Sequence, residues 1–406
     1  MTHAIHDFAA KLRTPAVAPI LERYVAWRRA VRAARAEGRE EPEAPEMAPV
    51  SINLDLTLAC NYACTHCIDW DILNTGPRME EENLRESLTL MAQRGLKSVI
   101  LIGGGEPTLY PGFAEFVRFA KQELKLQIAV VSNGSRGDRL LEIAPYLEEG
   151  DWIRLSLDSG SNELFRAMHQ PNSAAVDLDE ICSWIPKIRA ANSAPRLGYS
   201  FIIVWRGASR DEEQLLENIH EIVPAAVRAQ EAGFDYISYK PVLERLDDGA
   251  EVMNPSHTSE DTRVVVRRIR GEISKAREGA GESFEIYEST NLRSLEEGTW
   301  RKYTRQPKTC HMQALRQVLT PTGVFNCPAH RGVDKALLAP ADGYAGATNA
   351  EATGRGLARI LDEFDASVEC KEVTCLYHDT NWWIEGLVAE DGTEIEVDGE
   401  PGDTFL

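Results

Sequence analysis

The feature that most constrains the fold is a repeated alternation of β-rich apolar runs with segments long enough to form helices, from about residue 50 to residue 243. Repeated β-α units join parallel strands through helical crossovers, so this pattern predicts an α/β domain around a parallel sheet. The six expected strands are VSINLDLTL (50–58), SVILIGG (98–104), QIAVVSNG (127–134), DWIRLSLD (151–158), LGYSFIIVW (197–205) and YISYKPVL (236–243).

Three cysteines follow the first expected strand in the run LTLACNYACTHCID. Cys60, Cys64 and Cys67 have the spacing C-x3-C-x2-C. Three thiolates can hold three irons of a four-iron cluster and leave the fourth iron without a protein ligand. A metal site with an open position binds a substrate or cofactor. The spacing alone also occurs by chance and in zinc sites, so a second motif is needed.

The second motif is SVILIGGGEPTLYP, residues 98–111, in which an expected strand runs into three glycines, Glu106 and Pro107. Glycine lets the backbone approach a ligand closely and adopt positive φ, so the run marks either a tight turn or a ligand cradle. An ordinary β-α turn is the plain alternative. The position of the run one β-α unit after the cysteines favours the ligand cradle.

Together, the two motifs resemble those of the radical S-adenosylmethionine (SAM) enzymes. The resemblance implies a partial (β/α)6 TIM-like barrel, because a full eight-stranded barrel would require strands that the pattern does not show. It also implies a 4Fe-4S cluster whose open iron is chelated by SAM. In that family, reductive cleavage of SAM gives a 5'-deoxyadenosyl radical, which abstracts hydrogen from an unactivated carbon.

The resemblance also implies which residues bind SAM. The glycines and the glutamate of the second motif would hold the amino group of SAM, and polar residues at strand ends would hold its ribose and carboxylate. Turn chemistry is the alternative for the strand-end residues, because Ser, Asn and Asp are common where loops begin. The position before the third cysteine is usually aromatic in the family. The candidates are His66, Gly104, Gly105, Glu106, Ser132, Asn133, Ser156 and Asp158.

A second cysteine group lies near the C-terminus, at Cys310, Cys327, Cys370 and Cys375. The run between the first two predicts a hairpin, and the group resembles the SPASM extension or its shortened form, called twitch. A full SPASM pattern has seven cysteines, so we expect one auxiliary 4Fe-4S cluster here. A structural zinc or free core thiols are the alternatives. His378 is a spare ligand.

The chain divides into five expected regions. They are an N-terminal helical extension and linker (1–48), a radical SAM core (49–250), a helical connector (251–304), an auxiliary cluster domain (305–390) and an acidic C-terminal tail (391–406). The tail sequence EDGTEIEVDGEPGD contains seven acidic residues and no basic residue, which is typical of a hairpin or a solvated segment.

Charge and composition limit the partners. A net charge of -20 over 406 residues argues against nucleic acid, because phosphate binding needs a basic face. The sequence shows neither an apolar run of membrane-spanning length nor a signal peptide, so we expect a cytoplasmic protein. The expected partners are a small-molecule substrate and a reductase such as flavodoxin or ferredoxin.

The expected function is hydrogen abstraction from a small polar substrate (a sugar, aminocyclitol or nucleotide-like molecule), followed by oxidation, elimination or epimerisation. One alternative is a maturase that cross-links or epimerises a ribosomal peptide, and another is a non-catalytic iron-sulfur or zinc scaffold. Side chains that could face the substrate are few. The catalytic candidates are Lys240, Tyr239, Tyr199 and Cys182, with Trp205 and Arg331 as further possible contacts. Lys240 stands out because a lysine at an apolar strand end is costly to bury without a partner.

Overall fold

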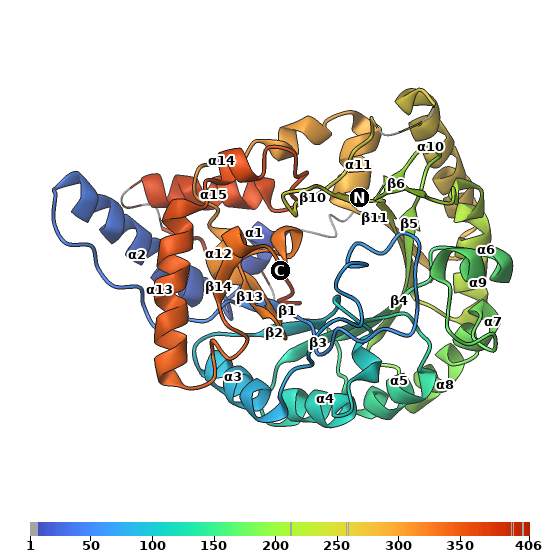
Figure 1. Ribbon diagram of the computed structural model, residues 1–406, viewed down its shortest axis with the longest axis horizontal. Helices are drawn as coiled ribbons and strands as arrows, with labels where there is room; N and C mark the ends of the chain where they lie inside the picture. Colours follow the sequence, from blue (N-terminus) through green and yellow to red (C-terminus); the bar gives the residue numbers. More distant parts are fainter. Residues whose placement is uncertain are drawn as a thin grey trace.

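A curved sheet of ten strands organises the protein, in the order β11-β8-β5-β4-β3-β2-β1-β12-β13-β14. The computed structural model describes residues 7–211, 213–256, 258, 260–390, 392, 394–399 and 402–406. Figure 1 shows the sheet as an arc with most helices on its outer side. The strands are β1 (Ser51–Leu54), β2 (Ser98–Leu101), β3 (Gln127–Ser132), β4 (Trp152–Ser156), β5 (Arg196–Ile203), β8 (Tyr236–Pro241), β11 (Glu285–Glu288), β12 (Arg316–Thr320), β13 (Gly323–Phe325) and β14 (Leu337–Ala339).

The helices fall into two groups. Those that connect the parallel strands are α3 (Glu81–Gln93), α4 (Phe113–Gln122), α5 (Gly137–Ile143), α6 (Asn162–His169), α7 (Leu178–Cys182), α8 (Ile185–Ala191), α9 (Ile222–Ala232), α10 (Thr262–Gly279) and α11 (Thr290–Glu297). Those of the two chain ends are α1 (Phe8–Leu12), α2 (Ala18–Ala36), α12 (Met312–Leu315), α13 (Ala347–Glu363), α14 (Ala366–Glu369) and α15 (His378–Ala389). Two small hairpins pair β6 (Ser209–Arg210) with β7 (Glu213–Gln214) and β9 (Glu244–Arg245) with β10 (Glu251–Val252).

All six strands predicted from the sequence form and lie parallel to their neighbours. The structure adds two more parallel strands, β11 beside β8 and β12 beside β1. The sequence pattern missed β11 because it is four residues long and lies in a charged connector, which was expected to be helical. Within the described residues, no pairing joins the two ends of the sheet, so the barrel remains open.

The inner face of the barrel is set by strand alternation. Along β4, Trp152, Arg154 and Ser156 are partly exposed on the concave side, whereas Ile153 and Leu155 are buried in the core. Alternate side chains point to opposite faces of a strand, so the inner face can carry polar groups while the outer face packs against helices. On β5, Gly198 makes room for a neighbouring ring, because a Cβ there would lie 2.2 Å from the Tyr236 ring.

The last residues of the chain close the N-terminal end of the barrel. Phe405 is 4% exposed and packs against Trp152, with ring centroids 5.6 Å apart. The backbone N–H of Thr404 donates to the Gln127 side chain at the start of β3, and Lys11 donates to the Phe405 carbonyl. Residues 402–406 therefore do not form the solvated tail that their acidic neighbours suggested. Figure 1 shows the C-terminus within the curve of the sheet.

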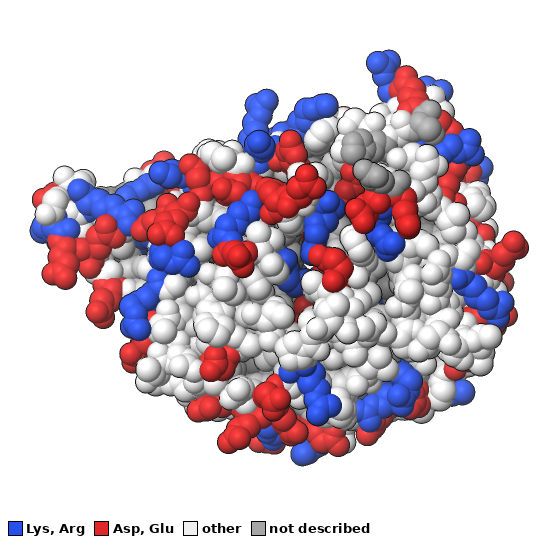
Figure 2. Space-filling model, viewed as in Figure 1, with Lys and Arg blue, Asp and Glu red and all other residues white. Residues whose placement is uncertain are grey.

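The N-terminal helices pack against the C-terminal region. Helix α2 lies beside α15, and the Tyr24 hydroxyl is 2.7 Å from Nδ1 of His311, whose Nε2 is 2.8 Å from Glu385. In the part of the chain that the structure describes, no helix combines the length and apolarity needed to cross a membrane. On the face seen in Figure 2, acidic and basic side chains are interspersed, and its described residues form no continuous basic patch.

The closure by Phe405 yields a stability prediction. Phe405→Ala should lower the free energy of unfolding by about 3–5 kcal/mol, because truncating a buried phenylalanine leaves a cavity. Urea denaturation of the metal-free protein measures this. Val397→Ala is the control, since Val397 is 51% exposed. Equal stability of the two variants would contradict the proposed packing of the C-terminus.

Candidate functional site

The first cysteine group lies on a loop that is held from two sides. The Asn74 side chain accepts a hydrogen bond from the Cys60 N–H and donates one to the Cys60 carbonyl. On the other side, the Thr65 N–H donates to the Met168 carbonyl at the end of α6. The loop is irregular, so these hydrogen bonds, rather than a helix or strand, fix the positions of the cysteines.

The three thiols of this loop lie close together. Burial raises the pKa of Cys64 well above its usual value, and the neighbouring Cys67 and Cys60 add to the shift. Burial raises the pKa of Cys67 to about 12, with a contribution from Asp69. Thiolates without a counter-charge are unfavourable here, whereas coordination to a metal cation deprotonates a thiol outright. This group of partly buried thiols therefore fits a metal centre.

The glycine run brings the end of β2 into direct contact with this loop. A Cβ on Gly105 would lie 2.2 Å from the Ala59 carbonyl oxygen, and one on Gly104 would lie 2.9 Å from an Asp55 carboxylate oxygen. The N–H groups of Gly105 and Glu106 donate to the carbonyls of Thr57 and Ala59. Gly104 also has φ of 60°, a region that favours glycine. The run therefore acts as a close-packing device between the two motifs.

Glu106 is buried beneath the loop and joins two strand ends. One carboxylate oxygen accepts from the Ser132 hydroxyl at 2.7 Å, and the other accepts from the Asn133 N–H at 2.7 Å. Thr108 donates through both its N–H and its hydroxyl. Burial raises the pKa of Glu106, and these hydrogen bonds oppose the shift. The carboxylate thus fixes the end of β3 relative to the end of β2.

A buried group of two histidines and an aspartate lies beside Cys64. Ligand atoms of His66, Asp158 and His169 all lie within 4.8 Å of one another. His66 Nε2 is 2.9 Å from the Asp158 carboxylate, and His169 Nδ1 is 3.2 Å from the Cys64 sulfur. Burial would raise the pKa of Asp158, but hydrogen bonds with His169 and His66 outweigh it and lower the pKa. Nδ1 of His66 is buried with no partner among the described residues.

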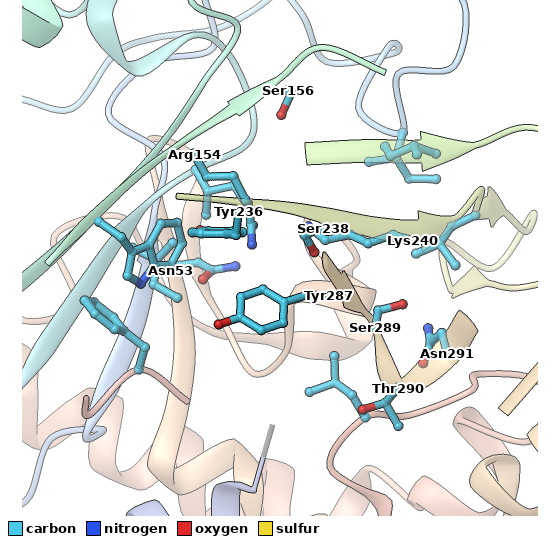
Figure 3. Close-up of a pocket in the computed structure, with 18 of the residues that line it drawn as sticks. Asn53, Arg154, Ser156, Tyr236, Ser238, Lys240, Tyr287, Ser289, Thr290 and Asn291 are labelled. Carbon is cyan, nitrogen blue, oxygen red and sulfur yellow. The ribbon is translucent and has the colours of Figure 1, made fainter. Parts of the chain in front are cut away.

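A cavity of about 780 Å³ opens beneath these residues, along the inner face of the barrel. Figure 3 shows side chains from β4, β8 and the segment after β11 that line it. Five sequence candidates line this cavity, namely His66, Asn133, Ser156, Asp158 and Lys240, together with Cys64 and Cys67. Gly104, Gly105, Glu106 and Ser132 are not among its lining residues, and the contacts described above place them beside the cysteine loop and at the ends of β2 and β3.

Four candidates for substrate contact do not line the cavity. The Tyr199 hydroxyl donates to the Ser159 carbonyl, and the Tyr239 hydroxyl donates to the Ile222 carbonyl at the start of α9. Both tyrosines are on the outer face of the sheet, in the hydrophobic core. Cys182 and Trp205 are also buried in this core. These placements do not support substrate contacts for the four side chains, because all four are buried in the core and none lines the cavity.

Arg331, the remaining candidate, forms an ion-pair bridge instead of facing the cavity. Its guanidinium lies 3.3 Å from the Asp55 carboxylate after β1 and pairs with Asp69 in the first cysteine loop. Burial raises the pKa of Asp55 to about 7, although Arg331 opposes the shift. Because Arg331 follows Cys327 closely in the sequence, this bridge ties the second cysteine region to the first.

The second cysteine group also gathers in space. Burial raises the pKa of Cys370 well above its usual value, with contributions from Cys310, Cys375 and Cys327. The hairpin predicted between Cys310 and Cys327 is formed by β12 and β13. A tetrahedral zinc, with Zn–S bonds of about 2.3 Å, would draw four sulfurs to within about 4 Å of one another. Among the described cysteines, no set of three sulfur atoms lies within 4.8 Å of one another.

Histidines near this group differ from expectation. His378, the spare ligand, lies 3.2 Å from Gln306 through Nδ1. His330 is the histidine beside the thiols, with Nε2 at 3.6 Å from the Cys370 sulfur and no exposed surface. The sequence analysis missed His330, although its position three residues after Cys327 is the signal that could have found it.

Two cavity arginines were also missed. Arg154 lies in the middle of β4, and Arg316 begins β12. Both line the cavity, as do the aromatic rings of Tyr236 and Tyr287. The alternation of DWIRLSLD places Arg154 on the same face as Ser156, which is the signal that pointed to an inward arginine.

Residues 54–219 match the family model described as the radical SAM superfamily. An S-adenosylmethionine-dependent nucleotide dehydratase of Thermoplasmatales archaeon (strain ISO4-H5) is 35% identical over 111 residues, which are 27% of this chain and 38% of that protein. The mycofactocin maturase MftC of Mycobacterium ulcerans is 31% identical over 134 residues, which are 32% of this chain and 34% of that protein. The matches thus span little more than a third of these curated relatives.

A solved structure extends the likeness to most of the fold. SuiB of Streptococcus suis, bound to S-adenosylmethionine, has a TM-score of 0.51 at 14% identity and covers 76% of this chain and 65% of its own. The fold and the cysteine loop thus define a metal-binding α/β protein of the radical SAM type. Residues 54–219 therefore form a domain of the radical SAM superfamily, whose members use a 4Fe-4S cluster together with SAM.

The contact between the two motifs can be tested through Gly105. Gly105→Ala should displace the cysteine loop, since the added Cβ meets backbone that cannot rotate away, at a cost of about 1–3 kcal/mol. We expect less iron per chain and weaker visible absorption after anaerobic reconstitution. Gly354→Ala is the matched control, because nothing lies within 4 Å of its Cβ. Normal iron content in Gly105→Ala would show that the close approach is not required.

Proposed function

We propose that the protein is an enzyme that binds a 4Fe-4S cluster through Cys60, Cys64 and Cys67, binds SAM beside it, and abstracts hydrogen from a small polar substrate. The observation that carries the proposal is that Cys64 and Cys67 line a cavity of about 780 Å³. When bound, the cluster and SAM supply a 5'-deoxyadenosyl radical. The chain supplies the binding surfaces, the orientation and the exclusion of water.

Several residues are arranged to hold SAM. In this proposal, Gly104, Gly105 and Glu106 hold its amino group, and Ser132 keeps the Glu106 carboxylate in place. Asn133, Ser156 and Asp158 lie at the cavity edge for the ribose and carboxylate. The Ser156 hydroxyl has no side-chain partner elsewhere in the described structure, which suits it to a ligand.

His66 has a distinct role in this arrangement. Asp158 fixes the imidazole through Nε2, and the unpartnered Nδ1 belongs to a ring that lines the cavity. A buried polar atom without a partner is unfavourable unless a ligand satisfies it. We assign His66 Nδ1 to a hydrogen bond with SAM. The position is usually aromatic in the family, and the imidazole of His66 adds a hydrogen-bonding atom to the ring there.

The cavity walls suit radical chemistry. Ile68, Ile100, Ile102 and Val242 contribute apolar surface, and Phe405 with its neighbours covers the N-terminal end of the barrel. Aliphatic walls exclude water and present no readily reducible group to a reactive intermediate. The volume lies within the range of about 300–1,000 Å³ that is typical of small-molecule sites. This volume favours a small molecule over a folded protein as the substrate.

The second cysteine group is proposed to bind one auxiliary 4Fe-4S cluster. Arg316 lies near Cys327 in space, and Leu376 follows Cys375 in the sequence. Both residues line the cavity. An auxiliary centre at this position would be near enough to accept an electron from a substrate radical. Oxidation is therefore favoured over elimination or epimerisation. Flavodoxin or ferredoxin would supply the initiating electron, and a cytoplasmic location fits two sets of reduced thiols.

A peptide maturase is the second candidate function, and the partial match to mycofactocin maturase favours it. The partial match to a nucleotide dehydratase favours the small-molecule proposal. The cover that residues 402–406 place over one end of the cavity supports the small-molecule proposal. A non-catalytic scaffold would not require a cavity of this size beside the thiols.

The proposal predicts SAM cleavage that depends on the first cysteine group. With dithionite, the reconstituted protein should release 5'-deoxyadenosine, and Cys64→Ala should abolish release, because a cluster with two protein thiolates does not keep its working structure. The wild type should contain about eight irons per chain, and replacement of Cys60, Cys64 and Cys67 should leave about four.

Cys182→Ala is the matched control for this experiment, since Cys182 lies in the hydrophobic core. Liquid chromatography of 5'-deoxyadenosine and a colorimetric iron assay are the measurements. Undiminished cleavage by Cys64→Ala would refute the proposed function. A content of four irons and one zinc in the wild type would refute only the auxiliary cluster.

The auxiliary cluster can be tested separately. Replacing Cys327 and Cys375 by alanine should remove about four irons and leave uncoupled SAM cleavage largely intact, because initiation depends on a different metal centre. Product formation, once a substrate is found, should fall by orders of magnitude. Full product formation by a variant that lacks the second cluster would show that its role is structural.

A further inference from the structure

Two basic side chains line the cavity without a salt-bridge partner among the described residues. Arg154 on β4 and Lys240 on β8 both line it, and Figure 3 shows their side chains reaching into the same space. Neither forms an ion pair with a carboxylate elsewhere in the described chain. The Arg154 guanidinium lies 4.9 Å from the centroid of the Trp152 ring, and its Nε is buried without a hydrogen-bond partner.

The other charged side chains of the cavity are already engaged. Among its carboxylates, Asp151 pairs with Lys121, and Asp403 pairs with Lys11. The third, Asp158, contacts His66 and His169. Among its cations, Arg196 pairs with Glu285, and Arg316 bonds to the neutral groups of Asn53 and Tyr377. Five basic side chains thus line the cavity against three acidic ones, in a protein whose net charge is -20.

This excess is unfavourable in the empty protein. Burial lowers the pKa of Lys240 well below its usual value, the charge of Arg154 lowers it further, and Asp158 offsets the shift only in part. Burial likewise lowers the pKa of Arg154. A bound anion would favour the charged forms of both side chains and so offset the cost of burying them.

We propose that Arg154 and Lys240 form a binding site for an oxyanion of the substrate, a phosphate or a carboxylate group. The inference rests on the proposed function and narrows its substrate from polar to anionic. The planar guanidinium can contact two oxygens at once, and the ammonium adds a point charge. Ser238, on the same strand as Lys240, and Ser289, after β11, also line the cavity with hydroxyl groups that can donate to an anion.

Arg154 lies deeper in the barrel than the residues proposed for SAM, whereas Lys240 lies at the end of β8. Arg154 is in the middle of β4, one inward position before Ser156, whereas the candidates for SAM lie at strand ends near the cysteine loop. One inward step along a strand is about 7 Å, which places the Arg154 backbone deeper in the barrel. The substrate would thus have its anionic group at depth and its reacting carbon towards the thiols.

Binding of simple anions to the SAM-saturated, reconstituted protein tests the proposal. Isothermal titration would use pyrophosphate for the phosphate source, malonate for the carboxylate source and glycerol as the neutral control. We expect one of the two anions to bind and glycerol not to bind. Arg154→Met and Lys240→Met should each weaken that binding at least about tenfold, because each removes a charged hydrogen bond. Arg355→Met, an exposed arginine on α13, is the matched control.

Thermal unfolding gives a readout that does not depend on the substrate. The melting temperature of empty Arg154→Met should be higher than that of the wild type, because an unpaired buried charge has been removed, and the anion that binds should raise only the wild-type value. A lower melting temperature would identify Arg154 as a structural residue and overturn the proposal. The proposal would also be overturned if neither anion bound, if both variants kept the wild-type affinity for the anion, or if the variants lost SAM binding to the same extent as anion binding. SAM cleavage by the wild type tests the proposed function separately.

Discussion

The structure depends on the direct backbone contact between the end of β2 and the first cysteine loop. The Glu106 N–H reaches the Ala59 carbonyl at 2.8 Å, which requires a residue without a side chain at position 105. From this contact, the Glu106 carboxylate extends beneath the loop to Ser132 and Asn133. One short segment therefore sets the relative positions of the thiols, the end of β3 and the mouth of the cavity. Because backbone atoms cannot change rotamer, the arrangement is rigid.

The parallel sheet and the two cysteine groups could be predicted from the sequence, because both depend on local patterns. Strand periodicity and cysteine spacing are properties of neighbouring residues, and all six predicted strands are present. The substrate-facing residues could not be chosen in the same way. Tyr199 and Tyr239 carry a polar group, as Lys240 does, but which face of a strand a residue occupies depends on register and packing, which span the whole sheet.

The role of Arg331 illustrates a second limit of sequence reasoning. A buried arginine beside a cysteine could face a substrate, but its charge is taken up by Asp55 and Asp69, which lie more than 250 residues earlier in the chain. Arg154 is the opposite case. Nothing in the sequence of its strand indicates that its guanidinium lacks a carboxylate partner in the described structure. Whether a charge is compensated is a property of the folded neighbourhood. It can be seen only when all the charged groups around a cavity are known.

Along β4 and β8, residues that face the core alternate with residues that face the cavity. Folding and substrate binding therefore constrain different positions of the same strands. Ile153, Leu155 and Tyr239 are buried in the core, whereas Arg154, Ser238 and Lys240 line the cavity. The outward positions determine whether the barrel folds, and the inward positions determine what it accommodates. A change of substrate could therefore evolve, or be engineered, by exchanging a few inward side chains while the packed face stays constant. The same scaffold could serve different chemistry with little cost to its folding.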